Sequence, residues 1–237
     1  KNGISCIKKN IVDLTWDFDN NTIYWTGIKP FVYTKMVGNS NERGYWYAMN
    51  EFCAGEHGGT HFDAPYHFNK DGWKVGEVPI DKLVAKGALI DLRNETQGRV
   101  ENISLDNEHG AFDQGTVLLI QFGRSQNWHN RTKYLGLDEN GKLNFPGISK
   151  QAAEWIAKSG KFYGVGLDTP SVDPGSTADF MTHRIFGQYQ IYGLENVKLV
   201  ETLPVRGFTL LVMPMKLREG TGAPLRLLAV LTSESIW

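Results

Sequence analysis

Three histidines and one aspartate lie within eleven residues, and all four are side-chain types that bind divalent metal ions. The run is His57-Gly58-Gly59-Thr60-His61-Phe62-Asp63-Ala64-Pro65-Tyr66-His67. In an extended segment alternate side chains share a face, so His61 and Asp63 can bind the same ion. His57 can join them from across the Gly58-Gly59 turn, because glycine lets the backbone pass close to a bound ion. Three protein ligands leave one coordination position for water, which is typical of a catalytic metal site.

His67 lies beyond Pro65, and we expect it to be too far round the loop to bind the ion but close enough to face the same cavity. An imidazole that titrates near neutral pH can take a proton from water and pass it to a leaving group. His67 is therefore the predicted general base and acid. A lone histidine is more often an ordinary core or surface residue, but this many converging ligand types favours a site.

Composition indicates one globular domain, residues 1–237, that acts on a small molecule. The chain is 41% hydrophobic and 22% charged, with a formal net charge of -1. Lys and Arg are scattered, so we expect no nucleic-acid partner. The longest apolar run, Phe208 to Met215, is interrupted by Thr209 and Pro214 and is shorter than the ~20 residues that span a bilayer, so we expect no membrane insertion.

Two features favour a secreted glycoprotein, with a cytoplasmic location as the alternative. Asn-X-Ser/Thr sequons occur at Asn20, Asn94, Asn102 and Asn130, and the chain starts at Lys1 rather than Met. Cys6 and Cys53 could pair in an oxidising compartment, or could remain two buried thiols. The cysteines alone do not decide between these locations.

Strand-like runs outnumber helical ones along the chain. Residues rich in Val, Ile, Leu and aromatics, bounded by turn residues, occur at 11–16, 31–37, 46–52, 88–92, 116–122, 162–167, 197–199, 208–213 and 225–231. The clearest helix is Lys150 to Lys158, with Ser149 as N-cap and Gly160 at its end. A weaker helical pattern covers Ile80 to Lys86. The fold class is therefore a strand-rich α/β or α+β domain, a mixed sheet with a few flanking helices.

The run from His57 to His67 resembles the motif His-X-Gly-Thr-His-X-Asp-X-Pro-X-His of the cyclase-like metal-dependent hydrolases. The segment from Lys216 to Arg226 is similar to the family's Gly-X-Gly-X-Pro-X-Arg segment, so the resemblance extends from about Asp13 to Val230. It implies that His57, His61 and Asp63 bind metal and that His67 transfers protons. It also implies the swivelling β/β/α fold and a homodimer in which part of the pocket comes from the partner.

A second pair of ligands follows from the same resemblance. The formamidase branch of the family has a distant His and Glu, twelve positions apart, that bind a second zinc, and His183 and Glu195 match that pair in order and spacing. Asp63 would then bridge two ions. Taken singly, His183 could be a satisfied core histidine and Glu195 a carboxylate at a helix start. The joint spacing favours the metal role.

Two aromatic residues are candidates for substrate binding. In the family an aromatic residue upstream of Gly and Pro-Phe lies over the substrate, and Trp25 in the run from Tyr24 to Phe31 matches it. The family's usual Trp-Pro-Gly is Trp25-Thr26-Gly27 here, and a lone Trp is more often a core residue. Tyr66, inside the motif, is the second candidate.

The resemblance implies hydrolysis of a C–N amide bond of an aromatic, indole-derived molecule by metal-activated water, with one or two Zn or Mn ions. His183 and Glu195 together favour an aryl formamide such as N-formylkynurenine. The isatin hydrolase branch, which opens a cyclic amide with Mn and lacks that Glu, is the alternative, because the motif run and the segment from Lys216 to Arg226 are closer to it. A catalytically inactive binding protein of the same fold is a third hypothesis, and the intact His67 argues against it.

Overall fold

A closed arrangement of strands forms the centre of the molecule. The computed structural model describes residues 10–40, 42–94 and 112–231. Eight strands form one sheet in the order β1-β10-β4-β8-β7-β6-β5-β9. Because β9 pairs with β10 as well as with β5, the sheet from β10 to β9 closes on itself as a barrel, and β1 is added beside β10. The strands are β1 (Ile11–Asp13), β4 (His61–Asp63), β5 (Val84–Asp91), β6 (Thr116–Gln121), β7 (Phe162–Leu167), β8 (Tyr192–Glu195), β9 (Phe208–Pro214) and β10 (Gly222–Leu231).

The central strands β5 to β8 are parallel and are covered on both faces. Every residue of β6 is buried, which is why its four central residues form a continuous apolar run instead of an alternating one. Val117 and Leu119 pack into a core shared with β4, β8, β9 and β10, whereas Leu118 and Ile120 pack into the core beneath the helices. The strand-rich mixed sheet predicted from the sequence is confirmed.

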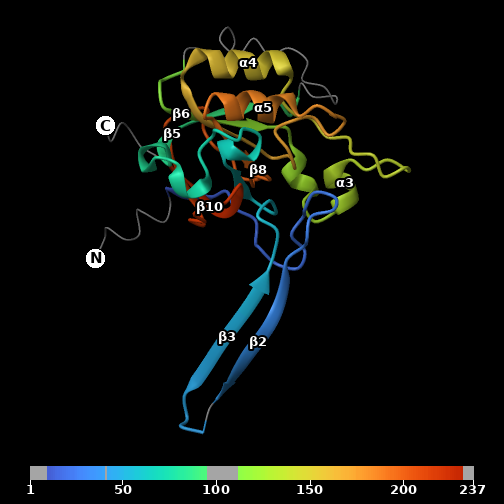
Figure 1. Ribbon diagram of the computed structural model, residues 1–237, viewed down its shortest axis with the longest axis vertical. Helices are drawn as coiled ribbons and strands as arrows, with labels where there is room; N and C mark the ends of the chain where they lie inside the picture. Colours follow the sequence, from blue (N-terminus) through green and yellow to red (C-terminus); the bar gives the residue numbers. More distant parts are fainter. Residues whose placement is uncertain (1–9, 41, 95–111, 232–237) are drawn as a thin grey trace.

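Helices cover one face of this sheet. α4 (Lys150–Ser159) and α5 (Met181–Gln188) lie along one side of the sheet, and α3 (Arg131–Leu135) lies lower on the molecule (Figure 1). α4 begins where the Ser149 hydroxyl accepts a hydrogen bond from the Ala152 N–H, and it ends at Gly160, which has φ 66°. This predicted helix is confirmed. Single 3₁₀ turns occur at η1 (Pro65–His67), η2 (Val75–Glu77), η3 (Ile80–Lys82) and η4 (Arg124–Asn127).

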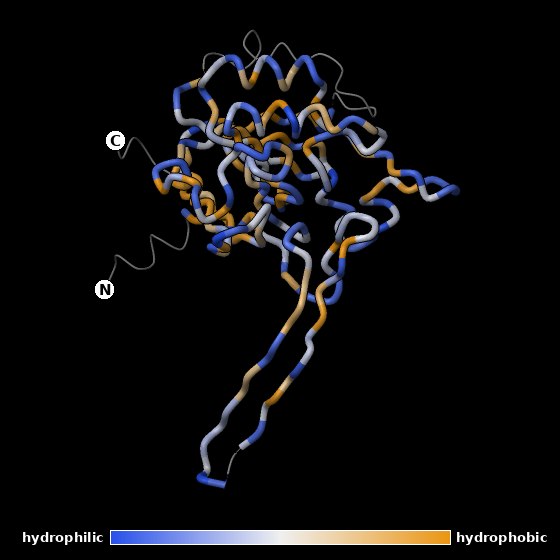
Figure 2. Tube along the Cα trace, in the orientation of Figure 1, coloured by the Kyte–Doolittle hydropathy of each residue, from blue (hydrophilic) through white to orange (hydrophobic). Residues whose placement is uncertain are grey.

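A long hairpin projects from the body of the molecule (Figure 1). It consists of β2 (Val32–Ser40) and β3 (Trp46–Cys53), which pair only with each other among the described strands. Apolar and polar residues are mixed along both of its strands (Figure 2). We call this hairpin the arm.

Two predicted elements differ from the structure, and one helix was missed. The helix expected over Ile80 to Lys86 is a 3₁₀ turn followed by the start of β5, because Val84 to Gly87 pair with β9 and that pairing outweighs local propensity. The run 197–199 is no strand, although Val197 and Leu199 are buried, and the Leu199 carbonyl accepts a bond from the Gln121 amide. Helix α5 was not predicted, because it is short and has no side-chain N-cap.

Some sequence predictions remain without a structural test. No helix in the three described ranges has the length and apolar character needed to cross a membrane. Asn20, Asn94 and Asn130 are exposed, while Asn102 lies outside the described residues. Cys53 is half-buried and Cys6 also lies outside the described residues.

Candidate metal centre

The pairing of β4 with β8 brings together the two sets of predicted ligands. His61 lies directly opposite Glu195, and Asp63 lies opposite Gly193. A side chain on residue 193 would begin 3.3 Å from the Asp63 Cβ, so the glycine leaves room for the aspartate. His61 and Asp63 thus project from one face of β4, as the strand periodicity predicts.

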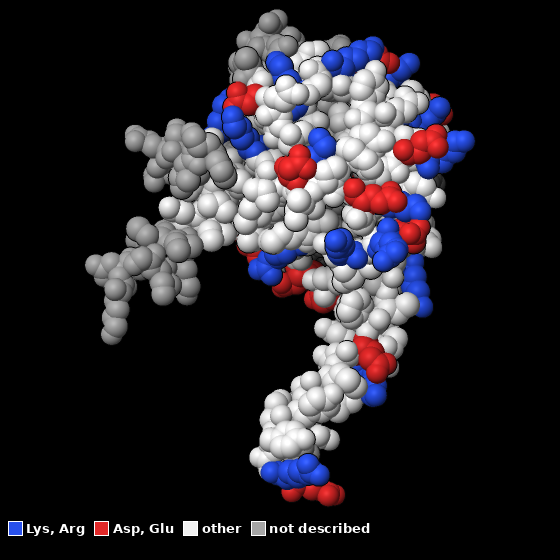
Figure 3. Space-filling model, turned by 60° about the vertical axis from the view of Figure 1, so that its left-hand side comes forward, with Lys and Arg blue, Asp and Glu red and all other residues white. Residues whose placement is uncertain are grey.

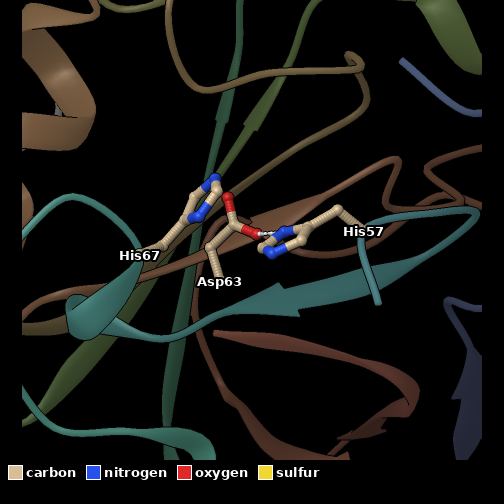
Figure 4. Close-up of side chains that lie close together, drawn as sticks. All are labelled: His57, Asp63 and His67. Atoms are coloured by element: carbon tan, nitrogen blue, oxygen red, sulfur yellow. Dashed lines mark hydrogen bonds and ion pairs between the residues drawn. The ribbon is translucent and has the colours of Figure 1, made fainter. Parts of the chain in front are cut away.

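The ligands from the motif converge on Asp63, and we call them the near half. His57 Nδ1 lies 2.6 Å from Asp63 Oδ1 (Figure 4). His61 Nε2 lies 3.2 Å from the same oxygen and 3.4 Å from Glu195 Oε2. His61 and Asp63 are buried and His57 is half-buried.

The remaining ligands, which we call the far half, come from α5 and β8. His183 Nε2 lies 3.1 Å from Asp63 Oδ2 and 3.2 Å from Glu195 Oε1. The other ring nitrogen, Nδ1, lies 2.6 Å from Asp173 Oδ2. Asp173 also accepts the backbone N–H groups of Thr182 and His183 and so fixes the start of α5. The structure therefore brings all five predicted ligands together, with Asp63 in contact with both halves.

Asn196, which the sequence did not indicate, fixes the backbone around His61. The Gly59 carbonyl accepts hydrogen bonds from Asn196 Nδ2 at 2.8 Å and from His61 Nδ1 at 2.9 Å. The Asn196 carbonyl accepts the Thr60 hydroxyl at 2.8 Å. Asn196 adopts a left-handed conformation with φ 54°, which Asn tolerates better than most residues. Asn196 therefore links the turn of the motif to the end of β8.

Electrostatics in the cluster favour the protonated forms of His61 and His183 beside an ionised Asp63. Burial opposes the charge of His61, but the nearby Asp63 and Glu195 outweigh it and raise the pKa of His61 to about 10. For His183, burial is likewise outweighed by hydrogen bonds to Asp173, Asp63 and Glu195, and its pKa is raised. Burial would raise the pKa of Asp63, but His57 and His61 hold it well below its usual range.

The donor set fits a divalent metal ion. His61 Nε2 is buried and makes no well-oriented hydrogen bond, although oxygens of Asp63 and Glu195 lie 3.2 and 3.4 Å away. A buried polar atom without a hydrogen bond normally costs about 1–3 kcal/mol. One ligand atom each from His61, Asp63 and Glu195 lies within 4.8 Å of the others, and the same holds for His57, Asp63 and His67. Imidazole nitrogens with carboxylate oxygens suit Zn or Mn, and a bound ion would replace the protons held here.

His67 lies closer to the ligands than its loop position predicts. Its ring stacks on the His57 ring with centroids 4.0 Å apart, because η1 turns the chain back after Pro65. The side chain remains accessible from solvent, but protein atoms crowd the imidazole. This desolvation lowers the pKa of His67 to about 4, against the attraction of Asp63. His67 is therefore neutral near pH 7 and can accept a proton.

A cavity of about 200 Å³ opens above the cluster. Trp25 lines it and makes edge contacts with Phe145 and with Phe180, at centroid distances of 6.1 and 6.2 Å. Phe68 also lines the cavity. Since a 150 Å³ apolar cavity can hold benzene, this space admits one aromatic ring with a small substituent.

Tyr66 does not lie among the residues that line this cavity. Its ring faces the Lys74 ammonium group, which lies 5.2 Å from the ring centroid. The position of the ring gives no support to the predicted contact between Tyr66 and the substrate. Side chains in η1 point in different directions, so sharing the motif with His67 did not place Tyr66 in the cavity.

Phe180 is a cavity residue that the sequence did not indicate. It precedes α5 and has φ 49°, a left-handed conformation that is strained for a bulky residue. This conformation places its ring beside Trp25 and at 6.2 Å from the His183 ring. No local pattern in the sequence distinguishes Phe180 from a core phenylalanine.

Gly58 is needed for a reason other than the expected approach to an ion. A Cβ on this residue would lie 2.0 Å from the Tyr24 ring, which packs directly on the Gly58 backbone. Tyr24 is buried, lines the cavity and pairs with Gly58 in an isolated β-bridge. The glycine therefore makes room for the Tyr24 ring against the turn that follows His57.

The barrel-like sheet and the buried cluster of imidazoles and carboxylates define the class: a strand-rich α+β protein with a cluster of side chains that could bind a metal ion. The Cyclase family model matches residues 12–174, more than half of the chain, and the chain belongs to that family. Together with the relatives below, this identifies a hydrolase of the Cyclase family.

Several known proteins are similar over nearly their full length. An isatin hydrolase of Roseibium aggregatum is 27% identical over 93% of this chain and 86% of its own. A kynurenine formamidase of Bacillus cereus is 29% identical over 91% of this chain and 94% of its own. The solved structure of isatin hydrolase A from Ralstonia solanacearum has a TM-score of 0.85 and 26% identity, over 97% of this chain and 95% of its own.

Proposed function

We propose that the protein is a metal-dependent amidohydrolase that cleaves the C–N bond of an aryl formamide of the N-formylkynurenine type. One observation carries the proposal: Asp63 joins His57, His61 and His183 in a buried cluster that opens into a cavity beside the neutral His67. The names of the relatives, kynurenine formamidase and isatin hydrolase, support amide hydrolysis of an aromatic substrate.

The cavity residues would orient the substrate. Trp25, Phe68 and Phe180 form an aromatic wall that adjoins His183, and an aryl ring can pack against it by offset or edge contacts. This packing would hold the formyl carbon over the cluster and exclude bulk water from it. Because the cavity is about 200 Å³, larger fused substrates would require movement of these rings.

Proton transfer is the task that we assign to His67. A divalent ion held by His57, His61, Asp63, His183 and Glu195 would supply Lewis acidity, which can activate water and polarise a carbonyl near neutral pH. His67 takes the proton from the attacking water as the new C–O bond forms. It then delivers this proton to the amine nitrogen as the C–N bond breaks, so the products are formate and an arylamine. The lowered pKa of His67 keeps the imidazole neutral and ready to accept the proton.

Two ions per subunit, Zn or Mn, form part of the proposal. The near half and the far half each offer a nitrogen beside Asp63, whose two oxygens face different halves. Glu195 Oε1 and Oε2 likewise face His183 and His61. A carboxylate that faces two ligand sets in this way can bridge two ions.

A substrate panel tests the proposal. The metal-free protein, reloaded with Zn²⁺ or Mn²⁺, is assayed with N-formylkynurenine, formanilide and isatin. We expect the highest kcat/KM with an aryl formamide and no turnover before reloading. Ring opening of isatin in preference to both formamides would overturn the substrate assignment, and turnover that is equal with and without metal would overturn the mechanism.

We also propose that the protein is a homodimer whose arms pack against the partner. The outer part of the arm exposes Met36, Trp46, Tyr47 and Met49, with fractional exposures between 38% and 68%. Uncharged surface covers much of the arm in Figure 3. An isolated two-stranded hairpin is marginally stable in water, so these side chains need a partner surface. Nine residues of strand span about 30 Å, enough to reach across a second copy.

Light scattering on the purified protein tests the dimer. We expect a dimer for the wild type and a monomer for the double variant Met36→Glu, Trp46→Glu, because charges on the arm cannot be buried without partners. The variant Lys35→Glu, at an exposed polar position of the same strand, is the matched control and should remain dimeric. A monomeric wild type would refute the proposal.

A further inference from the structure

Glu56 contacts Thr221, which in turn contacts the His57 ring. Its Oε2 accepts three hydrogen bonds at the start of β10: from the Thr221 hydroxyl at 2.8 Å, from the Thr221 backbone N–H at 2.9 Å and from the Gly222 N–H at 3.2 Å. An ionised carboxylate only accepts hydrogen bonds. The single hydroxyl proton of Thr221 is therefore committed to Glu56.

This commitment fixes the role of the Thr221 oxygen toward His57. The distance from Thr221 Oγ1 to His57 Nε2 is 2.8 Å. Because the hydroxyl proton already points at Glu56, the oxygen can only accept, and Nε2 must carry the proton. Nδ1 faces the cluster and lies 2.6 Å from Asp63 Oδ1, so a proton lies between these atoms when no ion is bound. When a metal ion displaces that proton, the lone pair of the neutral His57 is on Nδ1.

The other two histidine ligands have the opposite tautomer. His61 Nδ1 faces the Gly59 carbonyl at 2.9 Å, and His183 Nδ1 faces the Asp173 carboxylate at 2.6 Å. Both partners are acceptors, so both protons lie on Nδ1 and both Nε2 atoms face Asp63. His57 alone among these three histidines presents Nδ1 to the cluster.

We propose that Glu56 and Thr221 are positioning residues that hold His57 as its Nε2–H tautomer, so that Nδ1 is its metal-binding atom. This inference rests on the metal dependence of the proposed function and adds the mechanism that prepares one ligand. Partners of this kind, which orient a metal-binding histidine, typically change metal affinity 10–100-fold when they are removed.

Gly222, at the start of β10, also sets the position of the His57 ring. A Cβ on residue 222 would lie 2.5 Å from His57 Cε1 and 2.8 Å from Nδ1, so only glycine leaves room for the ring. Gly222 is the pairing partner of Asp63, and the Thr221 carbonyl accepts the Ala64 N–H at 3.0 Å. The strand that fixes the tautomer is thus tied directly to the strand that carries the other ligands.

Nitrogen-15 NMR of the Zn²⁺-loaded, histidine-labelled protein tests the tautomers, since two-bond couplings show which ring nitrogen carries the proton. We expect two metal-bound histidines protonated on Nδ1 and one protonated on Nε2, and the latter signal should disappear in His57→Ala. A spectrum in which all metal-bound histidines are protonated on Nδ1 would overturn the proposal.

Zn²⁺ affinity, measured by competition with a chelator, tests the positioning residues. Thr221→Val should weaken binding about tenfold, at the low end of the usual range, and Thr221→Ser should restore it. Glu56→Ala frees the hydroxyl to donate to Nε2, so a smaller loss in the same direction is expected. Thr132→Val, at an exposed position of α3, is the control.

Equal Zn²⁺ affinity in wild type, Thr221→Val and Glu56→Ala would refute the positioning role. A loss that Thr221→Ser fails to restore would also refute it, since it would reflect packing and not the hydroxyl. Neither readout depends on turnover, so an inactive but metal-binding protein would overturn the proposed hydrolysis and leave this inference intact.

Discussion

The two halves of the cluster are built in different ways. The near half comes from one short strand and its flanks, and its histidines are oriented by neutral acceptors, the Gly59 carbonyl and the Thr221 hydroxyl. The far half comes from a loop, helix α5 and strand β8, and His183 is oriented by a charged acceptor, Asp173. The histidines gathered by local sequence are thus oriented by neutral groups, whereas the histidine delivered by a separate helix is oriented by a carboxylate.

Neutralising the side chain that joins the two halves should have the largest effect on metal content. Asp63 contacts His57, His61 and His183, so in Asp63→Asn we expect neither half to retain a stoichiometric ion and activity to be lost with the metal. Elemental analysis after dialysis measures this, with Asp81→Asn at an exposed position as the control. Full metal content in Asp63→Asn would show that the halves bind independently.

Removing one ligand of the far half should have an intermediate effect on metal content. Glu195 contacts His183 and His61 and supplies the far half with its only β8 ligand, so Glu195→Ala should lower the bound metal from about two ions to about one. The control is Glu201→Ala, at an exposed position after β8. An unchanged stoichiometry would contradict the two-ion arrangement.

Asp173 and Thr221, which orient His183 and His57, allow a finer comparison of the two halves. Asp173→Asn removes the charge and leaves one acceptor oxygen for the N–H groups of Thr182 and His183 that two oxygens now serve, and we expect apparent metal affinity to fall about 100-fold. This exceeds the tenfold effect expected for Thr221→Val, because hydrogen bonds to ionised acceptors are about twice as strong as neutral ones. Chelator competition measures both, with Asp179→Asn in the same loop as the control. Equal losses would remove the distinction between charged and neutral support.

The smallest effect on the cluster is expected outside both halves, at Asp168. Burial raises the pKa of this carboxyl to about 6, although the backbone N–H groups of Phe122 and Ser125 stabilise its charge. Since its folded pKa lies above the unfolded value, its favourable contribution is complete below about pH 4 and is lost as the pH rises through 6. Ionisation at pH 7 thus costs at most roughly 3 kcal/mol.

Asp168→Asn removes this ionisation. The unfolding free energy of the variant, relative to wild type, should therefore increase between pH 4 and pH 7, while its metal content stays the same. Urea unfolding at the two pH values measures the difference, after a chelator has removed bound metal from both proteins. Parallel pH profiles for the two proteins would contradict the raised pKa.

The near half could be predicted from the sequence because it depends on one local rule. Alternation along an extended segment places His61 and Asp63 on the same face, and the structure agrees. His183 and Glu195 came only from a family spacing, since nothing local shows that β8 pairs with β4. Asp173, Glu56 and Thr221 were not predicted, because their partners lie 10 to 165 residues away and hydrogen bonds of this kind leave no periodic pattern.

The fold was predicted in outline for a similar reason. Long buried strands and the capped helix α4 carry strong local patterns, whereas β4 and β8 have only three and four residues and depend on their neighbours. The two strands of the arm were predicted. The arm projects from the body because β2 and β3 pair with none of the other described strands. Such an absence cannot be derived from the propensity of its residues.

The most direct test of the central claim is His67→Ala, with metal content and hydrolysis of N-formylkynurenine measured on the same sample. If His67 moves protons beside a metal held by other residues, the variant should keep the wild-type metal content and lose activity about 10²- to 10⁴-fold. His129→Ala, at an exposed position, should change neither quantity. Wild-type activity in His67→Ala at full metal content would contradict the account.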